Sequence, residues 1–431
     1  MKVLTIHNMG NPLKRRAGVI SIESLFKNYS EEIKCLNHDA RIRLPEKIKN
    51  MNFDLIILGP TFLYSRFNPQ LLNKFKKEYN FIANIETCKI ALPQDEYTYS
   101  EILDEWMCDW KISRIYSVLP KFKELIYPKF IKNGEIKEGF TMYINKKLIN
   151  KFKNKETNYR KIDVSYRASA LPESYGSIGQ LKRDIGLTTS KKLKNICNLN
   201  TDISIDNKKI ITGNKWYEFL ENSKSCIVTP SGSSLFDPKG SIRISVEKYK
   251  LKYPKSKFKE VEKNCFPNLD KQYIMTAISP RNIEAGLAGT VQICIDCEFS
   301  DILKANKDYI PLKEDLSNIQ EVIDIITNEN KLNKIAKNCK KALLDSKKLN
   351  EDFLLEEIIE YANKFKVMKE KSYQEDKLFD TFLSRYRLIE KKSFIFQVIK
   401  QMFIDTIKKI IGKQNYRRIL IYSLSKKNKI F

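Results

Sequence analysis

An arginine and a glutamate stand three residues apart near the start of a predicted helix. Ser279 is a good N-cap and Pro280 a good first helical residue, so Arg281 and Glu284 share one face of this helix. A guanidinium beside a helix N-terminus suits a diphosphate, and a carboxylate one turn further can accept hydrogen bonds from both hydroxyls of a ribose. The alternative is an intrahelical ion pair, which stabilises a helix by only about 0.3–0.5 kcal/mol.

Two further segments offer groups that bind anions. Arg167 follows the predicted strand 162–166, where a guanidinium can clamp phosphate oxygens, although it can equally be a surface arginine. Ser231, Gly232 and Ser233 form a loop after another predicted strand, and the main-chain amides of such a loop can cradle an anion. No Walker loop or GxGxxG motif is present, so an ordinary turn is the alternative here.

Three residues at predicted strand ends are candidates for a general base. Asp95 and Glu96 follow the fourth predicted strand, and His7 ends the first. A carboxylate or an imidazole at such a place can remove a proton or bind a hydroxyl group. Each is equally suited to be a helix cap or a polar loop residue, and His7 can also be a buried core imidazole.

These residues need a scaffold in which strands alternate with helices. Apolar runs typical of buried parallel strands are separated by segments with helical periodicity, which indicates βαβ units. The predicted strands are residues 3–7, 32–36, 54–59, 89–92, 114–118, 162–166, 226–229 and 291–295. The predicted helices include residues 16–29, 68–79, 100–110, 176–185, 216–222 and 351–366. The pattern fades in the Lys-rich stretch 120–160, which we interpret as a linker.

The expected fold is therefore α/β, with two Rossmann-like domains facing each other across a cleft and a basic helical tail. We place the domains at 1–150 and 151–370, and the tail at 371–431. In open sheets of this kind ligands bind at the carboxyl ends of the strands, where the candidate residues stand.

Composition narrows the class of partner. The 431 residues carry 78 Lys and Arg against 52 Asp and Glu, so the net charge is 78 − 52 = +26. Such a charge favours nucleic acid, phosphorylated small molecules or an acidic membrane. Only two histidines and nine scattered cysteines are present, which argues against a metal site, and Cys294 and Cys297 are interpreted as strand-end cysteines. No apolar stretch reaches a spanning length, so we expect a cytoplasmic protein.

Four stretches together resemble one group of bacterial enzymes. They are Ala91–Tyr97, Asp163–Arg167 with Leu181–Gly186, Thr229–Asp237, and Ile278–Thr290 running on to Leu312. The chain resembles glycosyltransferases of the two-Rossmann (GT-B) type from polysaccharide and surface-glycan assembly, related to spore-maturation glycosyltransferase-like proteins. The segment Glu-Ala-Gly-Leu-Ala-Gly-Thr from residue 284 is similar to their donor-binding Glu-Ala-x-x-x-Gly-Thr signature.

The resemblance implies a nucleotide-sugar donor on the second domain and a surface-glycan or lipid-linked acceptor on the first. Glu284 would hold the ribose, Arg281 and Arg167 the diphosphate, and the Ser231–Ser233 amides the phosphate or sugar. No metal or other cofactor would be needed. One position departs from the pattern, because Thr276 stands where retaining members carry another glutamate. A catalytically silent sugar-nucleotide-binding protein is therefore the alternative.

The C-terminal segment combines basic charge with helical periodicity. Residues 391–431 contain eleven Lys and Arg and one acid, a net charge of 11 − 1 = +10. Apolar residues recur at helical spacing, namely Phe396, Ile399, Phe403, Ile407 and Ile410. This pattern is typical of a helix lying on an anionic membrane, so we expect association with the inner face of the membrane; docking on the protein's own domains is the alternative. Because no recognition motif is present, we expect no specific nucleic-acid partner.

Overall fold

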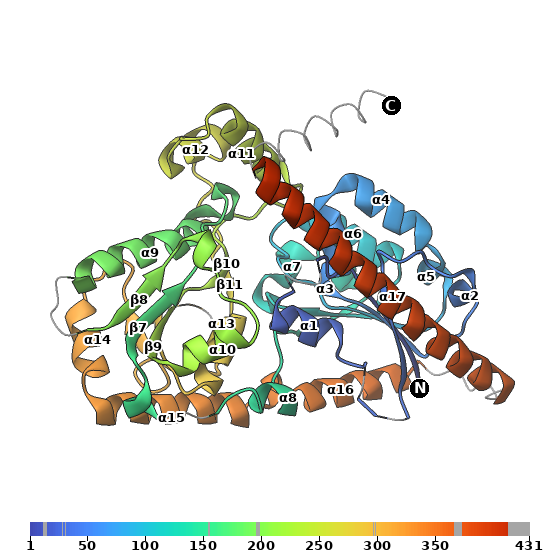
Figure 1. Cartoon of the computed structure of the whole chain (residues 1–431). Helices are drawn as coiled ribbons and strands as arrows, with labels where there is room; N and C mark the ends of the chain where they lie inside the picture. Colours follow the sequence, from blue (N-terminus) through green and yellow to red (C-terminus); the bar gives the residue numbers. More distant parts are fainter. Residues whose placement is uncertain are drawn as a thin grey trace.

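The structure, a computed structural model, consists of two α/β units side by side and a long C-terminal helix (Figure 1). It describes residues 1–412 except 12–14, 28, 31, 154–155, 195–198, 296, 298 and 366–372. Each unit is built on its own parallel sheet. The predicted fold class, two Rossmann-like domains and a helical C-terminal segment, is thereby confirmed.

The first unit contains a six-stranded parallel sheet in the order β2-β1-β3-β4-β5-β6. Its strands are β1 (Lys2–His7), β2 (Lys34–Asp39), β3 (Leu55–Leu58), β4 (Cys88–Ala91), β5 (Arg114–Ser117) and β6 (Glu135–Glu138). The central strands are buried apolar runs, as a sheet covered on both faces requires. The sixth strand lies inside the stretch that we predicted as a linker. Its sequence Glu-Ile-Lys-Glu is polar and partly exposed at the sheet edge, so it gave no strand signal.

Short helices connect these strands: α1 (Ala17–Glu23), α2 (Glu46–Lys49), α3 (Pro60–Leu63), α4 (Pro69–Glu78), α5 (Phe81–Asn84), α6 (Ser100–Asp109) and α7 (Lys123–Ile126). Helix α4 begins as predicted, with the Asn68 side chain accepting a hydrogen bond from the Leu71 amide. Aromatic side chains join α3, α4 and α6 into one core, because Phe62 packs on Phe75 and on Trp106.

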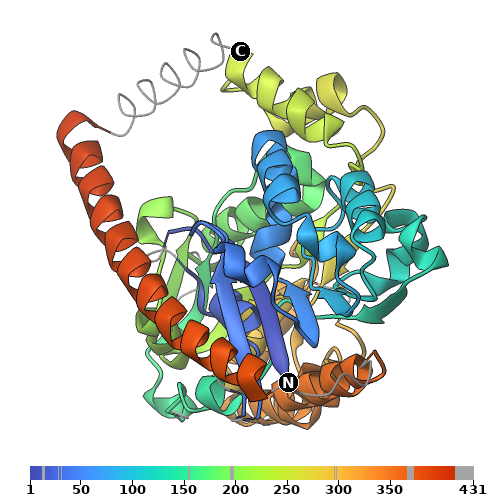
Figure 2. The same ribbon diagram turned by 90° about the vertical axis from the view of Figure 1, so that its right-hand side faces the viewer.

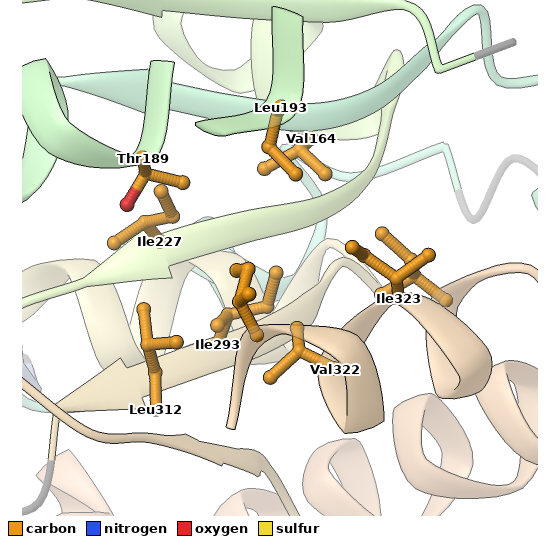
Figure 3. Close-up of a pocket in the computed structure, with 10 residues that line it drawn as sticks. Val164, Thr189, Leu193, Ile227, Ile293, Leu312, Val322 and Ile323 are labelled. Atoms are coloured by element: carbon orange, nitrogen blue, oxygen red, sulfur yellow. The ribbon is translucent and has the colours of Figure 1, made fainter. Parts of the chain in front are cut away.

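The second unit contains a five-stranded parallel sheet in the order β13-β12-β9-β7-β8. Its strands are β7 (Ile162–Arg167), β8 (Thr201–Ser204), β9 (Ser223–Val228), β12 (Val291–Ile295) and β13 (Ile310–Leu312). Its helices are α9 (Gly176–Lys194), α10 (Asn214–Glu221), α13 (Pro280–Leu287), α14 (Ile319–Ile326) and α15 (Glu329–Asp345). Val164, Ile227 and Ile293 on neighbouring strands meet Val322 of α14 (Figure 3). The space left between them is about 10 Å³, so this is a packed core and not a ligand site.

An insertion separates β9 from α13. It contains the antiparallel pair β10 (Ser231–Ser233) and β11 (Met275–Ala277), and the helices α11 (Ser241–Lys252) and α12 (Phe258–Cys265). The insertion also contacts the first unit, because the Tyr99 amide donates to the Asp237 carbonyl (2.9 Å) and the Asp237 amide donates to the Tyr97 carbonyl (2.8 Å).

The chain crosses between the units twice at one place. The segment with α8 (Lys146–Ile149) leads into the second unit, and α16 (Glu351–Asn363) returns to the first (Figure 1). The two crossings are bonded, since the Ile144 amide donates to the Leu349 carbonyl (2.7 Å). The predicted boundary at residue 370 puts α16 in the second domain; in the structure Glu357 of this helix accepts a hydrogen bond from Arg114 of β5 (3.0 Å). Because the long-range partners of α16 lie on the first sheet, this helix packs with the first unit.

Helix α17 (Tyr373–Ile411) lies across the first unit (Figures 1 and 2). Phe379, Leu383 and Tyr386 are buried against that unit, and the Tyr386 hydroxyl contacts the His38 ring. Lys34 pairs with Asp380 at 2.6 Å. Within the residues that the structure describes, none of the helices is long and apolar enough to cross a membrane.

Candidate functional site

The N-terminus of α13 lies where the two units meet. The Thr141 hydroxyl of the first unit donates to the carbonyl of Ile278, just before α13 (3.1 Å). Nearby, the rings of Tyr97 and Tyr175 pack edge to face with their centroids 6.0 Å apart. Side chains at the start of α13 therefore have the first unit as a neighbour.

Helix α13 begins as its sequence predicts. The Ser279 side chain caps the helix, and the Asn282 side chain accepts from the Ser279 amide in return (3.0 Å). Gly286 faces α15 so closely that a Cβ there would lie 2.3 Å from Leu343. The helix is thus held tightly on its own unit, and its first turn is fixed.

Glu284 is 9% exposed and holds one hydrogen bond within its unit. The indole nitrogen of Trp216, on α10, donates to its Oε2 at 2.8 Å. Burial raises the pKa of Glu284, while the Trp216 hydrogen bond, Arg281 and Arg16 of the first unit lower it. Its Oε1 has no hydrogen-bond partner among the described residues, so this oxygen remains available as an acceptor.

Arg281 does not pair with Glu284. Its guanidinium lies over the rings of Tyr166 (5.5 Å) and Trp216 (5.4 Å) and donates to the Arg167 carbonyl. No salt bridge joins Arg281 to a carboxylate in the part of the chain that the structure describes. The alternative of an intrahelical ion pair is therefore wrong.

Lys182 of α9 is a third cation at this place, and we did not predict its role from the sequence. Burial, Arg281 and Arg16 lower the pKa of Lys182 to about 8, whereas Asp95 raises it. Arg281 of the second unit and Arg16 of the first unit therefore both act on Lys182; we call these three side chains the cation cluster. The cluster has three cations, and only two carboxylates, Asp95 and Glu284, interact with them. Such an excess of positive charge favours the binding of a polyanionic ligand.

Asp95 and Glu96 are neighbours in sequence but face different surroundings. Asp95 has a left-handed backbone (φ 51°), its carbonyl accepts from the buried Arg66 (2.8 Å), and its carboxylate accepts from the Tyr97 hydroxyl (2.6 Å). Glu96 is fully buried and accepts from the Val118 amide (2.9 Å) and the Tyr127 hydroxyl (2.6 Å). Burial raises the pKa of Glu96 to about 7. Glu96 thus bonds to residues inside the first unit. Of the two carboxylates, only Asp95 acts on Lys182 of the cation cluster.

His7 is buried at the carboxyl end of β1, as the alternative of a core imidazole predicted, and neither of its ring nitrogens has a hydrogen-bond partner among the described residues. Burial lowers the pKa of His7 to about 3, so the ring is neutral at physiological pH.

Glu23 of α1 is also buried in this unit and accepts from the Thr61 amide (2.6 Å). Burial raises the pKa of Glu23 to about 8.

Two predicted anion-binding segments have other partners in the structure. The Arg167 guanidinium pairs with Asp202 on the neighbouring strand β8 (2.7 Å) and lies over Phe219 (4.5 Å). The expected loop at Ser231, Gly232 and Ser233 is the strand β10, paired with β11. A Cβ on Gly232 would lie 2.0 Å from the Met275 carbonyl oxygen, so this glycine permits close strand contact. The expectation of a loop at these residues is thus wrong, and the binding of an anion by their amides stays a prediction.

Among the residues described, no group of three or more His, Cys, Asp or Glu side chains could hold a metal ion. Thr276, which stands where the resemblance expected a glutamate, belongs to the insertion; it is buried in β11 opposite Gly232.

No protein-family model and no curated protein matches the sequence. Among solved structures the chain is similar to Anabaena HepE in complex with UDP-glucose, with 10% identity, a TM-score of 0.46, and coverage of 84% of this chain and 100% of that one. It is similar to T4 phage β-glucosyltransferase with 12% identity, a TM-score of 0.42, and coverage of 85% and 98%. It is similar to S. aureus TarM with 12% identity, a TM-score of 0.41, and coverage of 74% and 57%. All three TM-scores lie below 0.5, and the function is therefore inferred from this chain's own residues.

Proposed function

We propose that this protein is a glycosyltransferase that takes a sugar from a nucleotide-sugar donor. The observation that carries the proposal is the pair Arg281 and Glu284 on the first two turns of α13, which both contact Trp216 and do not pair with each other. The cation cluster suits a diphosphate, and the carboxylate suits ribose hydroxyls. Arg281, Lys182 and Glu284 belong to the second unit, and Arg16 belongs to the first.

In the proposed reaction the bond between the sugar and the diphosphate breaks, and an acceptor hydroxyl forms a new bond to the sugar. The cation cluster and the N-terminus of α13 stabilise the charge that the leaving diphosphate gains, so the proposed mechanism uses no metal or other cofactor. Asp95 takes the proton of the acceptor hydroxyl. Arg66 keeps Asp95 in place through hydrogen bonds to the carbonyls of Gln94, Asp95 and Thr98.

We propose that the acceptor is a surface glycan or a lipid-linked glycan held by the first unit. A lipid-linked acceptor is confined to a membrane surface, so its transferase must reach that surface. We therefore place the working protein at the inner face of the membrane. The exposed apolar residues of α17 support this localisation.

Calorimetric titration with UDP, GDP, CDP and TDP tests the donor site. The nucleotide that binds most tightly to the wild type should lose at least about tenfold in affinity in Glu284→Ala, because a charge-assisted hydrogen bond is worth about 1.5–3 kcal/mol. Glu96→Gln is the control, since Glu96 is also a buried glutamate but its hydrogen-bond partners, the Val118 amide and the Tyr127 hydroxyl, lie within the first unit. Unchanged affinity in a folded Glu284→Ala protein would contradict the proposal.

A catalytically silent binder of sugar nucleotides is the second candidate. It is favoured by Thr276, which is buried in β11 and offers no carboxylate. Hydrolysis of the bound sugar nucleotide, measured by the release of free nucleotide, separates the two functions. Release that Asp95→Asn abolishes supports the transferase, and tight binding with no release supports the binder.

A further inference from the structure

The outward side of α17 is apolar over most of its second half. Large apolar side chains stand exposed there: Leu388 (62%), Ile395 (49%), Phe396 (67%), Ile399 (60%), Met402 (59%), Phe403 (65%) and Ile410 (77%). We call this set the outer face. Surface apolar residues are ordinarily scattered singly, so a continuous row of this size marks a contact site.

The outer face lies opposite the side that holds α17 to the protein. At 3.6 residues per turn its members fall within an arc of about 120° around the helix axis. Phe379, Leu383 and Tyr386, which are buried against the first unit, fall on the other side of the helix. Figure 2 shows the upper part of α17 standing clear of the strands. Neither unit therefore covers the outer face.

Lysines border the outer face on both sides. In the same helical projection Lys391 and Lys409 follow one border of the arc, Lys400 follows the other, and Lys392 falls within the arc near its N-terminal end; all four are exposed. The two acids of this stretch, Glu390 and Asp405, fall on the remaining side of the helix. A second copy of this chain would bring these lysines together, whereas anionic lipid headgroups would neutralise them.

We propose that the outer face of α17 binds the surface of an anionic membrane. The apolar side chains enter the boundary between headgroups and acyl chains, and the bordering lysines contact the headgroups. The helix lies flat, because its outer face runs along its length. Since the inner side of α17 is fixed to β2 through Lys34 and Asp380, the first unit is the one held next to the bilayer. This inference does not depend on the proposed transfer reaction.

Co-sedimentation of the full chain with phosphatidylcholine vesicles, with and without phosphatidylglycerol, tests the proposal. The double variant Phe396→Ser/Phe403→Ser should lower partitioning onto the anionic vesicles by at least about tenfold. The matched control is Gln397→Ser/Gln401→Ser, on the partly buried side of the same turns, and should bind like the wild type. Lys391→Gln/Lys400→Gln/Lys409→Gln should remove the preference for anionic vesicles.

Equal partitioning of the Phe396→Ser/Phe403→Ser variant would overturn the proposal. So would a wild-type dimer, seen by size-exclusion chromatography without vesicles, that this variant dissociates. If the variant does not fold by circular dichroism, Phe403→Trp keeps the face apolar and reports on it directly. A blue shift of its emission on anionic vesicles, relative to the wild type, supports the proposal, and no shift overturns it.

Discussion

Replacing Trp216 by Phe should weaken donor binding in a way that depends on pH. The substitution keeps an aromatic ring beneath Arg281 but removes the indole N–H that donates to Glu284 at 2.8 Å. A hydrogen bond to a charged group contributes about 1.5–3 kcal/mol, and one pKa unit corresponds to about 1.36 kcal/mol. The pKa of Glu284, already raised by burial, should therefore rise further when this hydrogen bond is lost.

The assay is calorimetric titration of the tightest-binding nucleotide at pH 6 and at pH 8.5. A raised pKa leaves more of Glu284 protonated at pH 6, and a protonated carboxyl accepts ribose hydrogen bonds less well. The Trp216→Phe variant should therefore lose more affinity at the lower pH than at the higher pH, relative to the wild type at the same pH.

A double-mutant cycle shows whether Trp216 acts through Glu284. In the Glu284→Gln background residue 284 no longer titrates, so adding Trp216→Phe should change the affinity by no more than about twofold. An equal loss at both pH values, or a full additional loss in the Glu284→Gln background, would refute the reasoning. Trp216 would then act by packing or by direct contact with the nucleotide.

Three further outcomes are expected. Because the pKa of Lys182 is about 8, nucleotide affinity should fall by up to about tenfold between pH 7 and pH 9.5 as this side chain loses its charge, and Lys182→Met should show a flat calorimetric profile. Asp95→Asn should slow sugar transfer by about 10²–10⁴-fold in a product assay while nucleotide affinity stays close to the wild type. Burial raises the pKa of Glu23 from 4.5 to about 8, so the folded state holds a proton that the unfolded state loses between these values. The free energy of unfolding of the wild type, taken relative to that of Glu23→Gln, should therefore fall by a few kcal/mol, as an order of magnitude, as pH rises through this window in urea titrations; a constant difference would show that Glu23 titrates normally.

Local signals predicted the elements that carry the site. The Ser279 cap and Pro280 set the start of α13, and apolar runs marked the central strands of both sheets. The strands β6, β8, β10, β11 and β13 were missed; each has only three or four residues, and β6 (Glu-Ile-Lys-Glu) and β10 (Ser-Gly-Ser) also lack the apolar pattern of a buried strand. Their pairing depends on neighbours that are distant in sequence.

The site itself was only partly predictable, because its partners come from separate elements. Nothing near residue 284 in sequence indicates that Trp216 donates to its carboxylate, or that Lys182 lies within the influence of Arg281. Asp95 and Glu96 gave the same signal, although the chain turns between them and buries Glu96 beside Val118. Sequence spacing identifies types of chemistry, whereas long-range packing decides which side chains meet.

The double crossing between the units bears on how the chain matures during synthesis. The strands of the first sheet are synthesised early. The hydrogen bonds from Arg114 and Tyr116 to Glu357, and the contact of His38 with Tyr386, can form only after the C-terminal helices have been synthesised. The second unit, encoded in the middle, has all of its strands before α16 leaves the ribosome. The part made first is therefore finished last, and until then its unfinished apolar surface is exposed to chaperones and to aggregation.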